Sequence, residues 1–286
     1  MVANIFKIEG SPKKVLSYQE FRNSEKNNEF NGILFFSDIF NETPKKVIVI
    51  KEKRIVNVSF KDTYFENVRF IDVCFEKCLL FGADFQNCEF INCTFVETNT
   101  LKANFTDTLI DPDYFKDNFD LISDTNIAAD LYHSLYKNLS DERQPGRAKE
   151  SLYLMYRAEY AHLISQLNRK KITKKKYLKK RAWHIFNNLT SGYGLKLYRV
   201  LLTLIMVVFL FSTVNYLFRD AFFEVGKINT FLDSVYFTLV TLTTLGYGDV
   251  TPFTQWGKAI ITFQTGMGIV IISLFLSSIT SKVVRS

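Results

Sequence analysis

The sequence predicts a multidomain membrane protein, in which a β-solenoid and a helical hairpin precede an all-α region with two transmembrane helices and a short re-entrant helix. Three observations predict this organisation: a five-residue Phe repeat, a dense basic block after it, and two long uncharged runs in the last third of the chain. The chain has 286 residues, of which 47% are hydrophobic, so a mostly disordered protein is excluded. Its 12 Gly and 5 Pro exclude a collagen-like one.

A repeat of five residues defines the N-terminal domain. From position 60 to position 105, eight of the ten positions in the five-residue series are Phe, where chance predicts about one. Two residues before each of these positions lies a small or medium-sized residue, such as Cys78 or Ala83. A period of five fits neither a helix nor a flat strand, because it would spread the Phe side chains over several faces. Only a coil that turns a corner every five residues places every Phe inside.

This pattern resembles the pentapeptide-repeat family. The resemblance implies a right-handed quadrilateral β-helix with four pentads per coil. Ile50, Ile55, Ile110 and Phe115 keep the same phase, so we expect the solenoid over residues 46–117, in about three coils. Solenoids need caps at their ends, and we expect residues 1–45 to form one of them.

All four cysteines lie within the predicted solenoid. Three of them occupy the small inward position of the repeat, which favours small core residues over disulfides or a metal site, particularly in the cytoplasm. The cysteines are Cys74, Cys78, Cys88 and Cys93.

Residues 118–168 are predicted to form a helical hairpin. Asp124 is expected to cap the first helix, the sequence DERQPG at 141–146 to break it, and an apolar stripe to line each helix. The stripes predict packing against each other or against the solenoid. The histidines, His133, His162 and His184, are too scattered to predict a metal site.

Residues 169–198 are predicted to form a basic linker and an interfacial helix. From Arg169 to Arg199 the chain has eleven Lys or Arg and no acidic residue. Contact with anionic lipids, a solvated linker and nucleic-acid binding are three readings of this block, and we favour the lipids, because basic residues beside an apolar run mark a cytoplasmic membrane boundary. We expect no nucleic-acid partner. The lipid-contact candidates are Lys174, Lys175, Lys176, Lys179, Lys180 and Arg181.

Two uncharged runs are long enough to cross a bilayer of about 30 Å. They predict transmembrane helices at 200–218 and 257–281. The basic block lies before the first of them, so the positive-inside rule places residues 1–199 in the cytoplasm. The second helix returns Lys282 and Arg285 to the same side. The first residues contain no apolar run that resembles a signal peptide. We therefore expect a protein of the cell membrane with both termini in the cytoplasm.

Residues 199–286 are predicted to form a pore domain. Between the two spans, residues 238–252 read TLVTLTTLGYGDVTP. A dehydrated cation needs a column of oxygen atoms, which successive backbone carbonyls supply if all point to one axis. The dihedrals that this requires are open to Gly246 and Gly248, which have no Cβ. The segment 231–243 is apolar, too short to span, and suited to a helix whose C-terminal end points its dipole at a cation.

The segment TTLGYGD, residues 243–249, resembles the selectivity filter of potassium channels. The resemblance assigns the filter itself to residues 244–249. The resemblance implies a homotetramer in which each chain supplies one filter strand, with K⁺ as the permeant ion and no other metal or cofactor. Leu245 stands where Val is commonest in that family. The residues implied to coordinate K⁺ are Thr244, Leu245, Gly246, Tyr247 and Gly248, with the Thr244 hydroxyl at the inner end.

Four further residues are implied to support the filter: Thr243, Val240, Tyr236 and Asp249. Val240 stands where some bacterial relatives have a Glu that pairs with the filter Asp, so that pair is missing here. Tyr236 is expected to donate its hydroxyl hydrogen to Asp249 instead. Gly266 and Gly268 on the second span are hinge candidates, although close helix packing is an equally good reading of them.

The sequence thus predicts a potassium-selective channel, and no nucleophile, phosphate loop or metal cluster predicts an enzyme. The solenoid is expected to gate or assemble the pore, with a cytoplasmic protein or a small ligand as its possible partner. The alternative function is a membrane-anchored pentapeptide-repeat scaffold that binds a protein partner and whose pore is silent or non-selective.

Overall fold

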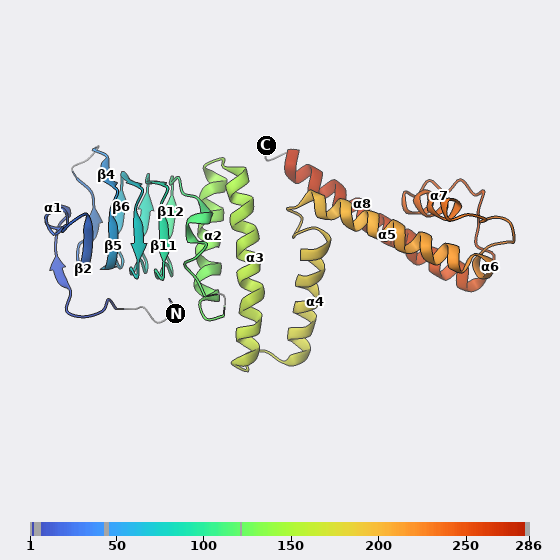
Figure 1. Ribbon diagram of the computed structural model, residues 1–286, viewed down its shortest axis with the longest axis horizontal. Coiled ribbons are helices and arrows are strands. Elements are labelled where there is room, and N and C mark those ends of the chain that lie inside the picture. Colours follow the sequence, from blue (N-terminus) through green and yellow to red (C-terminus); the bar gives the residue numbers. More distant parts are fainter. Residues whose placement is uncertain (1, 3–6, 43–45, 121, 284–286) are drawn as a thin grey trace. The chain divides into compact units, whose positions relative to one another are not determined.

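The computed structural model in Figure 1 describes residues 2, 7–42, 46–120 and 122–283. The predicted cap at 1–45 and the tail with Arg285 therefore lie partly outside the described residues. The chain divides into two compact units, residues 1–181 and 182–286. Each unit is described by itself below.

The first unit contains a β-solenoid made of short parallel strands, which confirms the predicted fold class (Figure 1). Its strands form three ladders, β1-β2-β5-β8-β11, β10-β7-β4 and β12-β9-β6-β3, and isolated bridges from Ser59 through Leu79 to Asn99 mark a fourth side. The elements are β1 (Lys13–Val15), α1 (Tyr18–Asn23), β2 (Glu29–Phe35), β3 (Ile39–Phe40), β4 (Ile48–Lys51), β5 (Arg54–Ser59), β6 (Tyr64–Glu66), β7 (Val68–Ile71), β8 (Cys74–Glu76), β9 (Asp84–Gln86), β10 (Glu89–Ile91), β11 (Thr94–Val96), β12 (Asn104–Thr106) and the 3₁₀ helix η2 (Pro112–Phe115).

The solenoid extends further toward the N-terminus than the predicted range 46–117. Phe30 pairs in register with Ile55, and Phe40 pairs with Phe65, so β2 and β3 belong to an earlier coil. Phe30, Phe35 and Phe40 keep the five-residue phase of the repeat. In this coil Ile50 follows Phe40 by ten positions, whereas the corresponding residues of the next coil, Phe65 and Phe70, are five positions apart. This insertion of five residues interrupts the pattern in the sequence.

The corners of the coil explain why the repeat is five residues long. A residue with positive φ recurs at every fifth position, from Glu52 (φ 55°) to Asp107 (φ 48°). Asn and Asp, which tolerate this conformation best after Gly, occupy many of these positions. Each corner turns the chain onto the next side of the coil, so the Phe two residues before it points inward at every side.

Stacked rings fill the solenoid core. Phe65, Phe85 and Phe105 form one column, with ring centroids 4.6 and 5.1 Å apart. The inward cysteines lie beside these columns, and each thiol donates to a backbone carbonyl 23 residues earlier, as Cys78 does to Ile55 at 3.2 Å. Thr98 and Thr108 make the same contact with their hydroxyls. All four cysteines are free, and the three inward ones, Cys78, Cys88 and Cys93, are core side chains that occupy the position of a Thr.

Burial makes three of the thiols chemically inert. It raises the pKa of Cys78 and of Cys88 to about 12 and that of Cys93 to about 11, while Cys74 is only partly buried. A thiol with a pKa of about 12 forms about 1,000-fold less thiolate than an ordinary thiol, and one with a pKa of about 11 forms about 100-fold less. We expect iodoacetamide at pH 8 to modify Cys74 alone in the folded protein and all four cysteines in denaturant, as mass spectrometry would show. Rapid modification of Cys78 in the folded protein would contradict this packing.

Side-chain amides close the backbone ladder where the coils end. Asn138 donates to the Thr108 carbonyl at 2.7 Å and accepts from the Thr108 amide at 3.1 Å. Asn118 makes the same pair of bonds with Thr98, at 2.9 and 2.7 Å. Each amide thus replaces the peptide group that a further coil would supply. At the other end of the solenoid, Phe21 of α1 covers the core and stacks on Phe30 at 4.3 Å.

The predicted hairpin consists of α2 (Thr125–Asp141) and α3 (Pro145–Asn168). The buried face of α2 packs on the last coil of the solenoid and on α3. Asp124 stands at the N-cap of α2, but its side chain caps no amide of that helix. Its carboxylate instead accepts from the amides of Val2 and Asp120, both at 3.1 Å, so this detail of the prediction is wrong.

The division between the two units falls within α4 (Lys174–Thr190). The second unit continues with α5 (Leu197–Leu217), α6 (Arg219–Phe222), α7 (Phe231–Leu242) and α8 (Gln255–Val283). Helices α5 and α8 are long and apolar enough to cross a membrane, and only 28% and 22% of their most apolar windows are buried inside the chain. Such low burial is unlike the core helix of a soluble protein and leaves apolar surface for lipid or for other subunits.

Candidate functional site

The short helix α7 begins with a reciprocal pair of hydrogen bonds. The Thr230 hydroxyl accepts from the Asp233 amide at 3.2 Å, and the Asp233 carboxylate accepts from the Thr230 amide at 2.8 Å. This capping box satisfies two amides that the first turn leaves free. The helix ends at Leu242, one residue before the predicted 243, and the next residues form the TTLGYGD loop.

The loop after α7 alternates in backbone handedness. Thr244, Gly246 and Gly248 have φ of 61°, 54° and 77°, while Leu245 and Tyr247 between them have negative φ. In a backbone that alternates between right-handed and left-handed residues, successive N–H groups point to one side and the carbonyl groups point to the other. The Val240 carbonyl at the end of α7 accepts from the amides of Leu245 at 3.0 Å and Gly246 at 3.4 Å. The end of the helix therefore holds the loop.

The described chain leaves this loop uncovered. Residues 243–249 are all exposed, including Leu245 at 62% and Tyr247 at 67%. The Thr244 hydroxyl donates to the Thr243 carbonyl at 2.6 Å, which turns its hydrogen away and leaves its lone pairs for a cation. Thr244 is β-branched and has positive φ, a conformation that such residues rarely adopt. The backbone is thus strained at the loop that carries the motif.

Tyr236 and Asp249 join the outer end of the loop to α7. The Tyr236 hydroxyl donates to Asp249 Oδ2 at 2.9 Å, which is the contact expected from the sequence. The Asp249 carbonyl accepts from Lys227 Nζ at 3.3 Å. Val240, which cannot pair with Asp249, is buried. The loop is therefore held at its inner end by the Val240 carbonyl and at its outer end by Tyr236.

The two glycines proposed as hinges have different surroundings on α8. A Cβ on Gly268 would lie 2.4 Å from the Leu242 carbonyl oxygen and 2.8 Å from its Cα, whereas a Cβ on Gly266 would meet nothing within 4 Å. Gly268 thus allows α8 to approach the end of α7 closely. This contact agrees with the close-packing reading of Gly268, one of the two readings of the sequence, whereas Gly266 makes no such contact with the described residues.

A buried polar contact, which the sequence analysis missed, joins three helices. Asn215 of α5 donates one hydrogen to Thr238 Oγ1 of α7 and the other to Gln264 Oε1 of α8, both at 3.0 Å. Gln264 Nε2 lies 3.5 Å from the Thr238 carbonyl. All three side chains are fully buried. The available signal was an amide in each of the two apolar runs, because polar groups within a membrane are costly.

The predicted lipid-contact residues lie on α4, which is segregated along its length. Its first half carries Lys174, Lys175, Lys176, Lys179, Lys180 and Arg181, all exposed. Its second half carries Trp183, Phe186 and Leu189, which are 65%, 45% and 68% exposed. The lysines in the first turn lie at the N-terminal, positive end of the helix dipole. Their positive charges destabilise the helix there unless an anionic partner offsets them.

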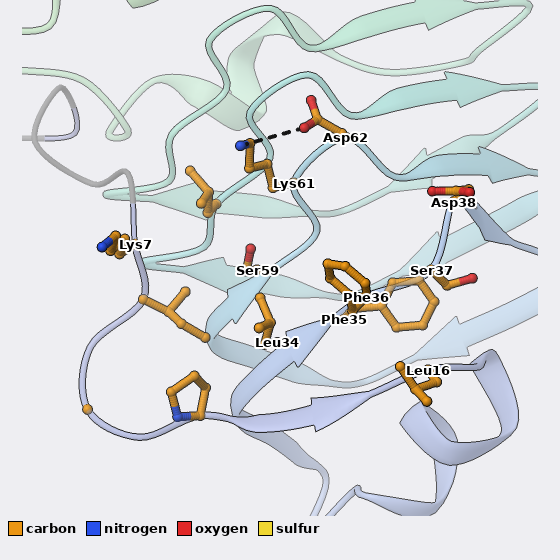
Figure 2. A pocket seen from close by; sticks show the side chains of 14 residues that line it. Lys7, Leu16, Leu34, Phe35, Phe36, Ser37, Asp38, Ser59, Lys61 and Asp62 are labelled. Atoms are coloured by element: carbon orange, nitrogen blue, oxygen red, sulfur yellow. Dashed lines mark ion pairs between the residues drawn. The ribbon is translucent and has the colours of Figure 1, made fainter.

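A groove of about 900 Å³ lies on the N-terminal side of the solenoid. Figure 2 shows Phe36, Leu16 and Asp38 along it, with Lys61 and Asp62 forming an ion pair across 3.7 Å. Lys7, in the segment that precedes β1, also lines the groove. The described residues contain no group of three or more His, Cys, Asp or Glu that could hold a metal ion.

Comparison with known proteins finds ion channels that are similar to part of the second unit. Residues 201–285 match the family Ion_trans_2, described as ion channel. A 63-residue segment, 22% of the chain, is 42% identical to a hyperpolarization-activated voltage-gated potassium channel of Methanocaldococcus jannaschii, of which it covers 29%. An 85-residue segment, 29% of the chain, is 33% identical to two-pore potassium channel 4 of Arabidopsis thaliana, of which it covers 30%. The chain thus spans less than a third of either relative.

A potassium channel pore is among the solved structures that match part of the chain. The crystal structure of a voltage-gated K⁺ channel pore module in a closed state in lipid membranes is 27% identical, with a TM-score of 0.24, and the match covers 31% of this chain and 87% of that one. By the family match and the two relatives, the C-terminal unit is similar in sequence to ion channels, two of them potassium channels, as the TTLGYGD motif predicts. The N-terminal unit is a β-solenoid consistent with a pentapeptide-repeat domain.

Proposed function

We propose that the protein is a potassium-selective channel that conducts K⁺ passively across the cell membrane. The alternating handedness of residues 244–248, in an exposed loop between two apolar helices, is the observation that carries this proposal. K⁺ sheds its water and passes through rings formed by the carbonyls of Thr244, Leu245, Gly246 and Tyr247 and by the Thr244 hydroxyl. The reaction makes and breaks no covalent bond, so the protein acts as a channel rather than as an enzyme.

The pore requires four copies of the chain. One filter strand offers carbonyls on one side only, and a cation that has lost its hydration shell must be surrounded by oxygens. A closed ring of four identical strands provides them. The exposure of residues 243–249 and of the apolar faces of α5 and α8 supports this assembly, because these surfaces need neighbours.

A reversal potential tests the proposal. Purified protein in liposomes with mixed K⁺ and Na⁺ is expected to show a potential close to that of K⁺. Protein that shows no K⁺ preference would overturn the proposal. The alternative is a membrane-anchored scaffold whose pore is silent or non-selective. Flux above that of empty liposomes would exclude the silent form, and a preference for K⁺ would exclude the non-selective form.

Tyr236→Phe tests the support of the filter by Asp249. The substitution removes the hydroxyl that lies 2.9 Å from Asp249 and changes little else, since the ring remains. We expect conduction to begin normally and to decay several-fold faster during sustained opening, because the outer end of the loop loses one of its restraints. The measurement is the time course of single-channel activity beside the wild-type protein. An unchanged time course would refute this role.

We propose further that both termini face the cytoplasm and that the first half of α4 contacts anionic lipids. The exposed basic residues 174–181 and the exposed apolar residues that follow support this, at about 1 kcal/mol per basic residue near an anionic surface. Vesicles with and without phosphatidylserine, mixed with an N-terminal fragment ending at residue 195, test it. Binding that persists after Lys174, Lys175, Lys176, Lys179, Lys180 and Arg181 are all replaced by Gln would contradict it.

The solenoid is proposed to gate or assemble the pore in response to a cytoplasmic protein or ligand, for which the groove beside Phe36 is the candidate site. Recording the full-length protein beside a truncated protein that begins at Trp183 tests this. Equal open probability and equal assembly of the two would contradict both roles of the solenoid.

A further inference from the structure

We propose that Asn215 is a positioning residue for the selectivity filter, acting through Thr238 and Gln264. The inference rests on the proposed function and deepens it by naming what fixes α7, the helix that carries the filter. The side-chain amide of Asn215 donates one hydrogen to Thr238 Oγ1 of α7 and the other to Gln264 Oε1 of α8, each at 3.0 Å.

Directional bonds distinguish this contact from ordinary packing. The apolar surfaces of α5, α7 and α8 can slide or rotate against each other at little cost, because lipid tails and apolar side chains are equivalent surroundings. A buried amide cannot do so, because a shifted hydrogen finds no water to bond with. Asn215, Thr238 and Gln264 are all 0% exposed, so no solvent replaces a lost partner. The three bonds therefore set one register among the three helices.

The register reaches the filter through two contacts of α7. Thr238 lies two residues before Val240, whose carbonyl holds the amides of Leu245 and Gly246. Gln264 of α8 contacts Thr238 of α7, and Gly268 of α8 contacts Leu242 of α7. On each helix the second residue follows the first by four positions. The equal spacing means that α7 and α8 meet at two successive turns while running in the same direction. Gln264 with Thr238 fixes the first turn, and Gly268 with Leu242 fixes the second.

Thr238→Val is the most direct test, because it keeps the shape of the side chain and deletes the hydroxyl that accepts from Asn215. Asn215→Leu removes the donor. The matched control is Ser234→Ala, which deletes a fully buried hydroxyl one turn earlier on α7 that has no hydrogen-bond partner within the described chain. Thr238→Ser, which restores the hydroxyl, is the rescue variant.

The readouts are the decay of conductance during sustained opening and the permeability ratio of K⁺ to Na⁺ in assembled channels, with thermal stability measured in parallel. Interhelical hydrogen bonds in membranes have strengths that correspond to a change of about threefold or more in an equilibrium. We expect Thr238→Val and Asn215→Leu to accelerate the decay at least threefold and to lower the permeability ratio, and Ser234→Ala and Thr238→Ser to behave as the wild type.

Two results would overturn the inference. One is wild-type decay and permeability in assembled Thr238→Val and Asn215→Leu channels, even with lowered thermal stability, because that describes a structural role alone. The other is failure of both variants to assemble while Ser234→Ala assembles, which describes a folding role. Absence of K⁺ flux in the wild-type protein would instead defeat the proposed function.

Discussion

Gly246→Ala is expected to lower K⁺ flux at least tenfold and to erase the preference for K⁺ over Na⁺. Gly246 has φ of 54°, and a Cβ there would meet nothing within 4 Å in its own chain, so the cost is conformational rather than steric. A left-handed conformation costs an L-residue about 1–2 kcal/mol, and four copies would bear this cost together. Alanine relieves it by turning to negative φ, which ends the alternation of handedness and moves a carbonyl out of line.

Flux and reversal potential in liposomes measure this effect. Leu245→Val is the control, because Leu245 already has negative φ and its side chain is exposed. We expect this variant to remain selective. A Gly246→Ala channel with wild-type selectivity would show that the backbone of this loop does not determine the selectivity.

Gly268→Ala is expected to lower both K⁺ flux and the stability of the assembled protein. The new Cβ would lie 2.4 Å from the Leu242 carbonyl oxygen, which belongs to backbone and cannot rotate away. Overpacking of this kind costs about 1–3 kcal/mol. The end of α7 must shift, and the filter that begins two residues later shifts with it.

The sign of the stability change separates packing from hinging. If Gly268 acted only as a hinge, alanine would stiffen α8 and raise its stability by about 1 kcal/mol while open probability fell. The close contact predicts a lower melting temperature instead. Gly266→Ala is the matched control, since it meets nothing within 4 Å, and we expect it to stabilise the helix slightly. A Gly268→Ala protein with a raised melting temperature would refute the packing role.

The sequence predicts the features whose physical cause is local. A Phe at every fifth position requires a corner at every fifth position, and the positive φ values from Glu52 to Asp107 are those corners. The TTLGYGD motif likewise predicts the alternating loop, because its glycines stand at two of the three left-handed positions. Both predictions depend on residues that lie close together in the chain.

Features that depend on contacts between residues far apart in the chain could not be predicted from the sequence. Asn215 and Gln264 lie 49 positions apart. The presence of one amide in each apolar run marks both residues as unusual, but the sequence does not indicate that they meet. Asp124 has the right position for a helix cap, but its carboxylate accepts a hydrogen bond from the Val2 amide, which is 122 positions away in the sequence. The first coil could have been found, since Phe30, Phe35 and Phe40 keep the phase, but the five extra residues before Ile50 hide the continuity.

The amides of Asn118 and Asn138 have a consequence for assembly. An open end of a β-solenoid is a row of unpaired peptide groups, on which another strand can add. In the proposed tetramer four solenoids would share one small volume, at an effective concentration of about millimolar. Unprotected ends would then join into continuous ladders between copies. Because each Asn side chain occupies the bonding sites of Thr98 or Thr108, this end offers no such template at these residues, and the copies can be brought together without polymerising through it.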